Sequence, residues 1–228
     1  MPDPIVKVVI PAQNEERAIG KVISEIPDWV SEVIIADNGS TDNTAQVAKD
    51  HGATVISVPE AGYGRACMGG IAAAGEYDII VFLDGDASDY PEDMSLLVQP
   101  IRDDEADMVI GSRVLGELEK GSLTPQQRFG NLLACWLMKL IWKHTYTDLG
   151  PFRAISREGL EKLNMEAPTF GWTVEMQIRA LKQGLRCQDA PVRYRKRIGK
   201  SKISGTVKGV IMAGVYILGT IFAEAVKR

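Results

Sequence analysis

The stretch Ile79-Ile80-Val81-Phe82-Leu83-Asp84-Gly85-Asp86 decides the fold that we expect for this chain. Its first five residues are apolar, with β-branched and aromatic side chains among them, which is typical of a strand buried on both faces of a parallel sheet. Two carboxylates separated by one glycine follow at the carboxyl end of that strand. Such a pair is costly unless a cation sits there, so Asp84 and Asp86 either hold a hard ion such as Mg2+ or Mn2+ or cap the following turn.

Strand and helix patterns alternate four times through the first half of the chain. Strands are expected over 5–10, 33–36, 54–58, 79–83 and 108–110. Helices are expected over 14–26, 43–51 and 91–101, and a further helix follows Arg65 and ends at Ala74. The alternation predicts βαβ units, whose right-handed crossovers bring the loops after the first four strands to one edge of a parallel sheet. That edge is the expected binding cleft.

The second half of the chain has a different pattern. An apolar stripe at helical spacing is formed by Leu132, Leu133, Trp136, Leu137, Leu140 and Ile141. A helix is expected over 172–183, and residues 147–153 are expected to form a loop that enters a strand. The last segment, 207–226, is apolar, but its 15 uncharged residues between Lys208 and Glu224 fall short of the ~20 that span a bilayer. We therefore expect a folded domain over 1–204 and an apolar helix over 205–228 that packs on it or contacts a membrane interface.

The composition is that of a globular protein, with 228 residues, 45% hydrophobic and 25% charged. A net charge of −4 argues against a nucleic-acid binder. Three widely spaced cysteines and an N-terminus without a signal-peptide pattern favour the cytoplasm. One local feature stands out: residues 193–202 hold six basic side chains next to the apolar tail. This run forms either a solvated edge or a surface that meets anionic lipid headgroups.

A glycine pair, Gly62-x-Gly64, follows the third expected strand. A dinucleotide fingerprint would follow the first strand and continue with a glycine where Cys67 stands, so a Rossmann dehydrogenase is improbable. These glycines either free backbone N–H groups for a nucleotide or form a turn.

Five stretches together resemble the family-2 glycosyltransferases with a GT-A fold, a Rossmann-like, mostly parallel sheet flanked by helices. They are Val9–Glu15, Asp37–Asp42, Phe82–Asp86, Gly111–Arg113 and Asp148–Arg153. Phe170–Glu175 and Gly199–Lys202 are similar to the polyprenyl-phosphate hexosyltransferases of that family, the dolichol-phosphate mannose or glucose synthase type.

The resemblance implies a role for each matching position. The residues that it implies for the nucleotide sugar are Pro11, Gln13 and Glu15 at the base and ribose, Asp37 at the base edge, and Asp84 at the ribose or sugar near the metal. Asp86 would be the direct metal ligand. The family's second ligand position is occupied here by Ser88, which leaves Ser88, Asp89 or water as that ligand. Arg113, Arg153 and Lys202 would face the phosphates.

The implied reaction is an inverting transfer of a hexose from UDP-glucose or GDP-mannose, with Mg2+ or Mn2+, to a polyprenyl phosphate at the cytosolic face of a membrane. A phosphate acceptor is already anionic near pH 7 and needs no base, whereas a hydroxyl acceptor would need Asp148 or Glu175 to take its proton. The alternatives are a soluble acceptor such as a phosphorylated small acid, and a non-catalytic protein that binds nucleotide sugars. The sequence leaves a homodimer open.

Overall fold

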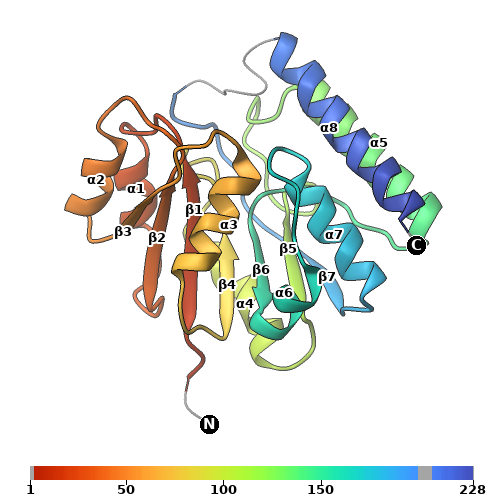
Figure 1. The fold of residues 1–228 in the computed structure, drawn as a ribbon, viewed down its shortest axis with the longest axis horizontal. Helices are drawn as coiled ribbons and strands as arrows, with labels where there is room; N and C mark the ends of the chain where they lie inside the picture. Colours follow the sequence, from red (N-terminus) through yellow and green to blue (C-terminus); the bar gives the residue numbers. More distant parts are fainter. Residues whose placement is uncertain (1–2, 200–206, 228) are drawn as a thin grey trace.

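The computed structural model describes residues 3–199 and 207–227. Its centre is a seven-stranded sheet in the order β3-β2-β1-β4-β6-β5-β7 (Figure 1). The strands are β1 Val6–Ala12, β2 Glu32–Asp37, β3 Thr54–Ser57, β4 Ile79–Phe82, β5 Met108–Ser112, β6 Arg153–Ser156 and β7 Cys187–Pro191. β6 runs antiparallel to β4 and β5, and the other neighbouring strands run parallel. The mostly parallel α/β sheet predicted from the alternation of patterns is therefore confirmed.

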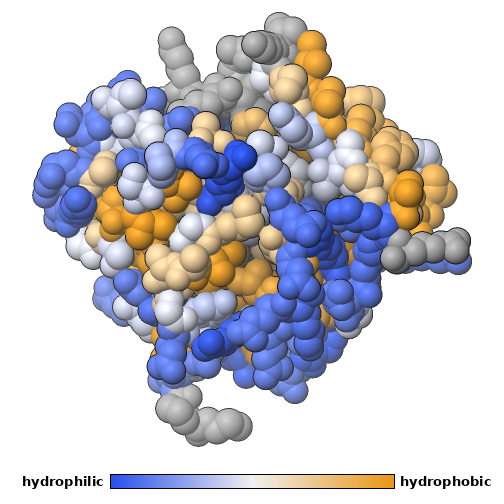
Figure 2. All heavy atoms as spheres, in the orientation of Figure 1, coloured by the Kyte–Doolittle hydropathy of each residue, from blue (hydrophilic) through white to orange (hydrophobic). Residues whose placement is uncertain are grey.

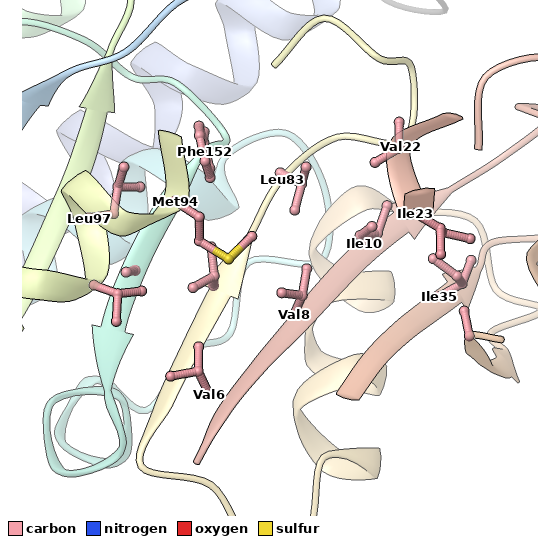
Figure 3. Packing of buried hydrophobic residues seen from close by; sticks show 14 of the residues in the cluster. Val6, Val8, Ile10, Val22, Ile23, Ile35, Leu83, Met94, Leu97 and Phe152 are labelled. Atoms are coloured by element: carbon pink, nitrogen blue, oxygen red, sulfur yellow. The ribbon is translucent and has the colours of Figure 1, made fainter. Parts of the chain in front are cut away.

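One face of the sheet is covered by α1 (Ile19–Ser24), α2 (Thr44–Asp50) and α4 (Met94–Arg102). Because side chains alternate along a strand, Val6, Val8 and Ile10 of β1 all reach this face, where they pack near Leu83 and Met94 (Figure 3). A short 3₁₀ turn, Pro91–Asp93, precedes α4. All residues of β4 are buried, as its unbroken apolar run predicts.

The other face carries α3 (Tyr63–Ala73), α5 (Pro125–Trp142), α6 (Arg157–Leu163) and α7 (Trp172–Lys182). α8 (Val207–Val226) lies outside them and packs along α5 and α7 (Figure 1). Within residues 3–199 and 207–227, no helix is long and apolar enough to cross a membrane. The expected C-terminal helix is thus present and packs on the domain, while the division of the chain at residue 204 stays a prediction.

One predicted helix begins later in the structure than expected. The helix expected from residue 14 begins only at Ile19, because Asn14 has a left-handed backbone (φ 54°) that a helix does not accept. Its side-chain oxygen instead accepts a hydrogen bond from the Thr41 N–H at 2.7 Å. The edge strand β7 ends at Pro191, and beyond it Tyr194 of the basic run makes only isolated bridges, to Asp89 and Leu118.

Candidate active site

The loops that follow the parallel strands meet at one edge of the sheet, as expected. Asn38, just after β2, ties three of them together: its side chain donates to the carbonyls of Val58 (2.9 Å) and Glu60 (2.8 Å) and accepts from the Gly62 N–H (2.7 Å). Gln13 donates to the Asn38 carbonyl at 3.1 Å. The tips of β1, β2 and β3 therefore form one connected surface.

The residues implied for nucleotide binding lie on this surface or just beneath it. Pro11 is buried inside β1, opposite Ala36 of β2. The Glu15 N–H donates to Thr44 Oγ1 at 2.7 Å, and the Asp37 carboxylate accepts from the Ser40 N–H at 3.0 Å. These contacts shape the loops at the β1–β2 tips, and contact of any of these side chains with a nucleotide stays a prediction.

Three carboxylates crowd the tip of β4. Asp86 is buried, and its Oδ1 accepts from both the N–H and the Oγ of Ser88, at 2.9 and 2.5 Å. Its Oδ2 pairs with Arg197 at 2.8 Å. Both carboxylate oxygens of Asp89 are buried without a hydrogen-bond partner. Buried carboxylates without partners are costly, so a bound cation would stabilise the tip of β4.

The pKa values at this tip shift in the direction that crowding dictates. Burial, followed by the nearby Asp86 charge, raises the pKa of Asp84 to about 7. Burial, followed by the charges of Asp84 and Asp86, raises the pKa of Asp89 to about 8. A divalent cation would offset this repulsion, and carboxylate oxygens are the ligands that Mg2+ and Mn2+ prefer.

These side chains fit a cation that is shared with another ligand. Among the described residues, no group of three or more His, Cys, Asp or Glu side chains is arranged as a metal site of its own. Mg2+ and Mn2+ are commonly bound through one or two carboxylates together with phosphate oxygens of a substrate. Asp84 and Asp86 match that mode. Ser88, predicted as a second ligand, uses its Oγ to bind Asp86.

Arg113 and Asp148 form a buried, forked ion pair. The Arg113 N–H and Nε both donate to Oδ2 of Asp148 at 2.8 Å, and Nη2 donates to Oδ1 at 2.6 Å. The Arg113 guanidinium also lies over the ring of Tyr194, 5.1 Å from its centroid. Asp148 therefore orients Arg113 at the cleft. Asp148 also accepts a hydrogen bond from the Leu149 N–H at 2.7 Å, and its use as a proton acceptor stays a prediction.

Two other predicted site residues are engaged inside the protein. Arg153 is fully buried, and its terminal nitrogens donate to the carbonyls of Thr173 (2.8 Å) and Gly150 (2.5 Å). Glu175 accepts from the Ala167 N–H at 2.8 Å and pairs with Arg179 at 2.9 Å. These contacts give no support to a phosphate contact for Arg153 or to a role as base for Glu175. Lys202 lies outside the described residues.

The glycine pair is needed for close packing. A Cβ on Gly64 would lie 1.9 Å from the Ala167 carbonyl oxygen, and one on Gly62 would lie 2.3 Å from that of Pro168. Gly62 also has a backbone that favours glycine (φ 150°). The start of α3 thus fits against the loop before α7, which accounts for both glycines without a nucleotide contact.

The basic run is neutralised within the protein. Arg193 pairs with Asp93 and Glu92, Arg195 with Glu25, Lys196 with Glu119, and Arg197 with Asp86. The interpretation of this run as a surface for lipid headgroups is therefore not supported over 193–197, and Lys200 and Lys202 lie outside the described residues. Arg197 was missed as a separate site residue. The surplus of acids over residues 84–93 was the available signal that such a run would be paired at long range.

A cavity of about 690 Å³ opens beside the tip of β4. Its polar end is lined by Asp84, Arg113 and Arg197 together with Tyr63 and Tyr194. Its other end is formed by α5 and α8, with Phe129, Leu133, Ile217 and Leu218 among the lining residues. Among the described residues that line it, none comes from the β1 and β2 tips. The cavity is therefore distinct from the expected nucleotide surface at those two tips.

Comparisons with known proteins give relatives over most of the chain. The family model described as "Glycosyl transferase family 2" matches residues 7–164. An uncharacterized glycosyltransferase of Mycobacterium tuberculosis is 35% identical over 210 residues, covering 91% of this chain and 94% of that protein. A dolichyl-phosphate hexose transferase of Haloferax volcanii is 32% identical over 203 residues, covering 86% and 85%.

The fold also matches solved structures. Glucosyl-3-phosphoglycerate synthase of Mycobacterium tuberculosis, crystallised with Mn2+, UDP-glucose and phosphoglyceric acid, aligns with a TM-score of 0.78 and 26% identity. The alignment covers 97% of this chain and 80% of that one. The same synthase has been crystallised with Mg2+ and UDP.

Proposed function

This chain belongs to glycosyl transferase family 2 and is a glycosyltransferase with a GT-A fold, and on that premise we propose that it transfers a hexose from a nucleotide sugar to a polyprenyl phosphate. The donor is UDP-glucose or GDP-mannose, and the cofactor is Mg2+ or Mn2+. Asp84 and Asp86 would hold the cation, which would supply positive charge to the leaving diphosphate when bound. The nucleotide lies along the tips of β1 and β2.

The shape of the cavity carries the choice of acceptor. At its polar end, Arg113 and Arg197, each already paired with a carboxylate, have further N–H donors for an anionic head group, and its apolar end between α5 and α8 suits a hydrocarbon chain. A ligand with both properties, a lipid phosphate, matches the two ends together. In the proposed reaction, a phosphate oxygen of the acceptor attacks the anomeric carbon from the face opposite the diphosphate, and the bond from that carbon to the diphosphate breaks.

The states of the two candidate bases support an anionic acceptor. The carboxylate of Asp148 is bound by the Arg113 guanidinium, and that of Glu175 is bound by Arg179 and the Ala167 N–H. A hydroxyl acceptor would require a carboxylate with a free oxygen to take its proton, whereas a phosphate is already ionised near pH 7. Arg113, held in a fixed orientation by Asp148, then supplies preorganised positive charge to phosphate oxygens.

A soluble phosphorylated acid is the second candidate acceptor. The similarity to a glucosyl-3-phosphoglycerate synthase favours it, and the same two arginines could bind its phosphate. This acceptor leaves the apolar end of the cavity unused. For that reason we rank it after the lipid.

The proposal includes peripheral contact with the cytosolic face of a membrane. α5 and α8 expose a set of large apolar side chains, and orange spheres gather along this edge in Figure 2. The set is Phe129, Leu132, Trp136, Leu140, Ile211, Val215 and Phe222, which we call the α5–α8 apolar face. Exposed apolar surface of this kind marks a membrane or protein contact.

The test is a partition assay with radiolabelled donor sugar, Mn2+ and either undecaprenyl phosphate or 3-phosphoglycerate. We expect label in the organic phase with the lipid, and none with Asp86→Asn. Label that stays in water, and appears there only with 3-phosphoglycerate, would replace the proposed acceptor by the soluble one. Absence of transfer to both acceptors with every donor tested would refute both.

A further inference from the structure

Two helical glycines line the apolar end of the cavity, Gly130 from α5 and Gly214 from α8. A Cβ built on either would meet no atom within 4 Å. Gly130 is exposed and Gly214 is half-buried. Each therefore leaves a gap that a larger side chain would fill.

Neither glycine is required by the backbone. The glycines with positive φ in the described residues do not include Gly130 or Gly214, so both have a backbone that any residue adopts. Glycine is also disfavoured inside a helix relative to alanine or leucine. Unlike Gly64 and Gly171, which have neighbours within 2.3 Å of a built Cβ, these two are not needed for close packing. Their shared effect is open space along one wall of the cavity.

We propose that this gap is a lateral port, through which the hydrocarbon chain of the lipid acceptor passes between α5 and α8 from a bilayer. The inference rests on the proposed function and names the path of its acceptor. Phe129, which lines the cavity and is 67% exposed, lies at the mouth of the port. Leu132 of α5 and Val215 of α8, each within two residues of one of the glycines in the sequence, are also exposed and belong to the α5–α8 apolar face.

The composition of the cavity favours a lipid over a second copy of this chain. One cavity is lined both by residues of α5 and α8 and by Arg113 and Arg197, whose guanidinium groups also pair with Asp148 and Asp86. A protein surface seated on that face would cover the apolar side chains but leave the charged inner end unmatched. A lipid with an anionic head matches both parts, and its chain can remain in the bilayer while its phosphate reaches Asp84.

Leucine at these positions should close the port. We would compare Gly130→Leu, Gly214→Leu and the double variant with Gly219→Leu as the matched control. Gly219 lies on α8, its built Cβ also meets nothing within 4 Å, and it does not line the cavity. Gly130→Ala and Gly214→Ala complete a graded series of smaller side chains. Thermal unfolding and Mn2+-dependent binding of UDP-glucose or GDP-mannose check that each variant is folded and binds donor.

The readout is the ratio of transfer rates to undecaprenyl phosphate and to the short geranyl phosphate. Filling an apolar site with an extra side chain should lower this ratio about tenfold or more for the leucine variants, less for alanine, and not for Gly219→Leu. An unchanged ratio in a folded double variant, or an equal fall in the control, would overturn the port. If the wild type used only 3-phosphoglycerate, the proposed function itself would have failed, and the port with it.

Discussion

The orientation of Arg113 should depend on Asp148, and Asp148→Asn tests this directly. The carboxylate is buried and accepts hydrogen bonds from the Arg113 N–H, Nε and Nη2 and from the Leu149 N–H. Asparagine keeps the shape but removes the charge, which leaves a largely buried guanidinium unpaired. Breaking a buried ion pair in this way costs about 3–5 kcal/mol. At about 2–4 °C per kcal/mol for a chain of this size, the melting temperature should fall by about 6–20 °C.

The assay is thermal unfolding of wild type and variant, followed by kcat/KM at a temperature where both are folded. A displaced Arg113 should lower kcat/KM by about 10²-fold, the usual cost of an ångström-scale misplacement. Glu161→Gln is the control, because its pair with Arg157 is exposed and such pairs add little stability. A melting temperature for Asp148→Asn that moved no further than that of Glu161→Gln would refute the reasoning.

Four further predictions concern the metal site, its pH dependence, the glycine packing and the membrane. Asp86→Asn should abolish the Mn2+-dependent part of donor binding in titration calorimetry, and unchanged heats would contradict the cation site. Burial raises the pKa of Asp89 from 3.8 to about 8, so the folded protein holds a proton there that the unfolded chain releases, and the stability linked to that proton is lost as pH rises between those values. In chelator-treated protein, the free energy of unfolding should therefore fall from pH 5 to pH 8 more steeply in the wild type than in Asp89→Asn. Gly64→Ala should cost about 1–3 kcal/mol of unfolding free energy, because the Ala167 carbonyl must move, whereas Gly219→Ala should not destabilise. The basic side chains of residues 193–197 are paired inside the protein, so membrane binding should depend on the exposed apolar Trp136 and not on charge. The fraction of protein that floats with neutral vesicles should therefore fall in Trp136→Glu and change little with salt, and a strong salt dependence would speak against apolar docking.

The order of strands and helices was predictable because it follows from local patterns. An unbroken apolar run predicts a strand buried on both faces, and β4 is one. Alternating strand and helix predicts parallel pairing, and the loops then meet at one edge whatever their contents. The boundaries of the elements were less predictable. The Asn14 side chain accepts a hydrogen bond from the Thr41 N–H in the loop after β2, and Asn14 has a left-handed backbone, so α1 begins later than its sequence pattern predicts.

The sequence by itself determined that Asp84 and Asp86 stand at the end of a buried strand, because burial and backbone direction depend on near neighbours in the chain. Only the tertiary structure decided which charges meet: Arg113 with Asp148, Arg197 with Asp86, and Arg195 with Glu25. Opposite charges pair with whichever partner the fold brings within hydrogen-bond reach, and in most of these pairs that partner lies far away in the chain. The same holds for the cavity, because its polar lining residues and the two apolar helices α5 and α8 come from separate parts of the chain that only the fold brings together.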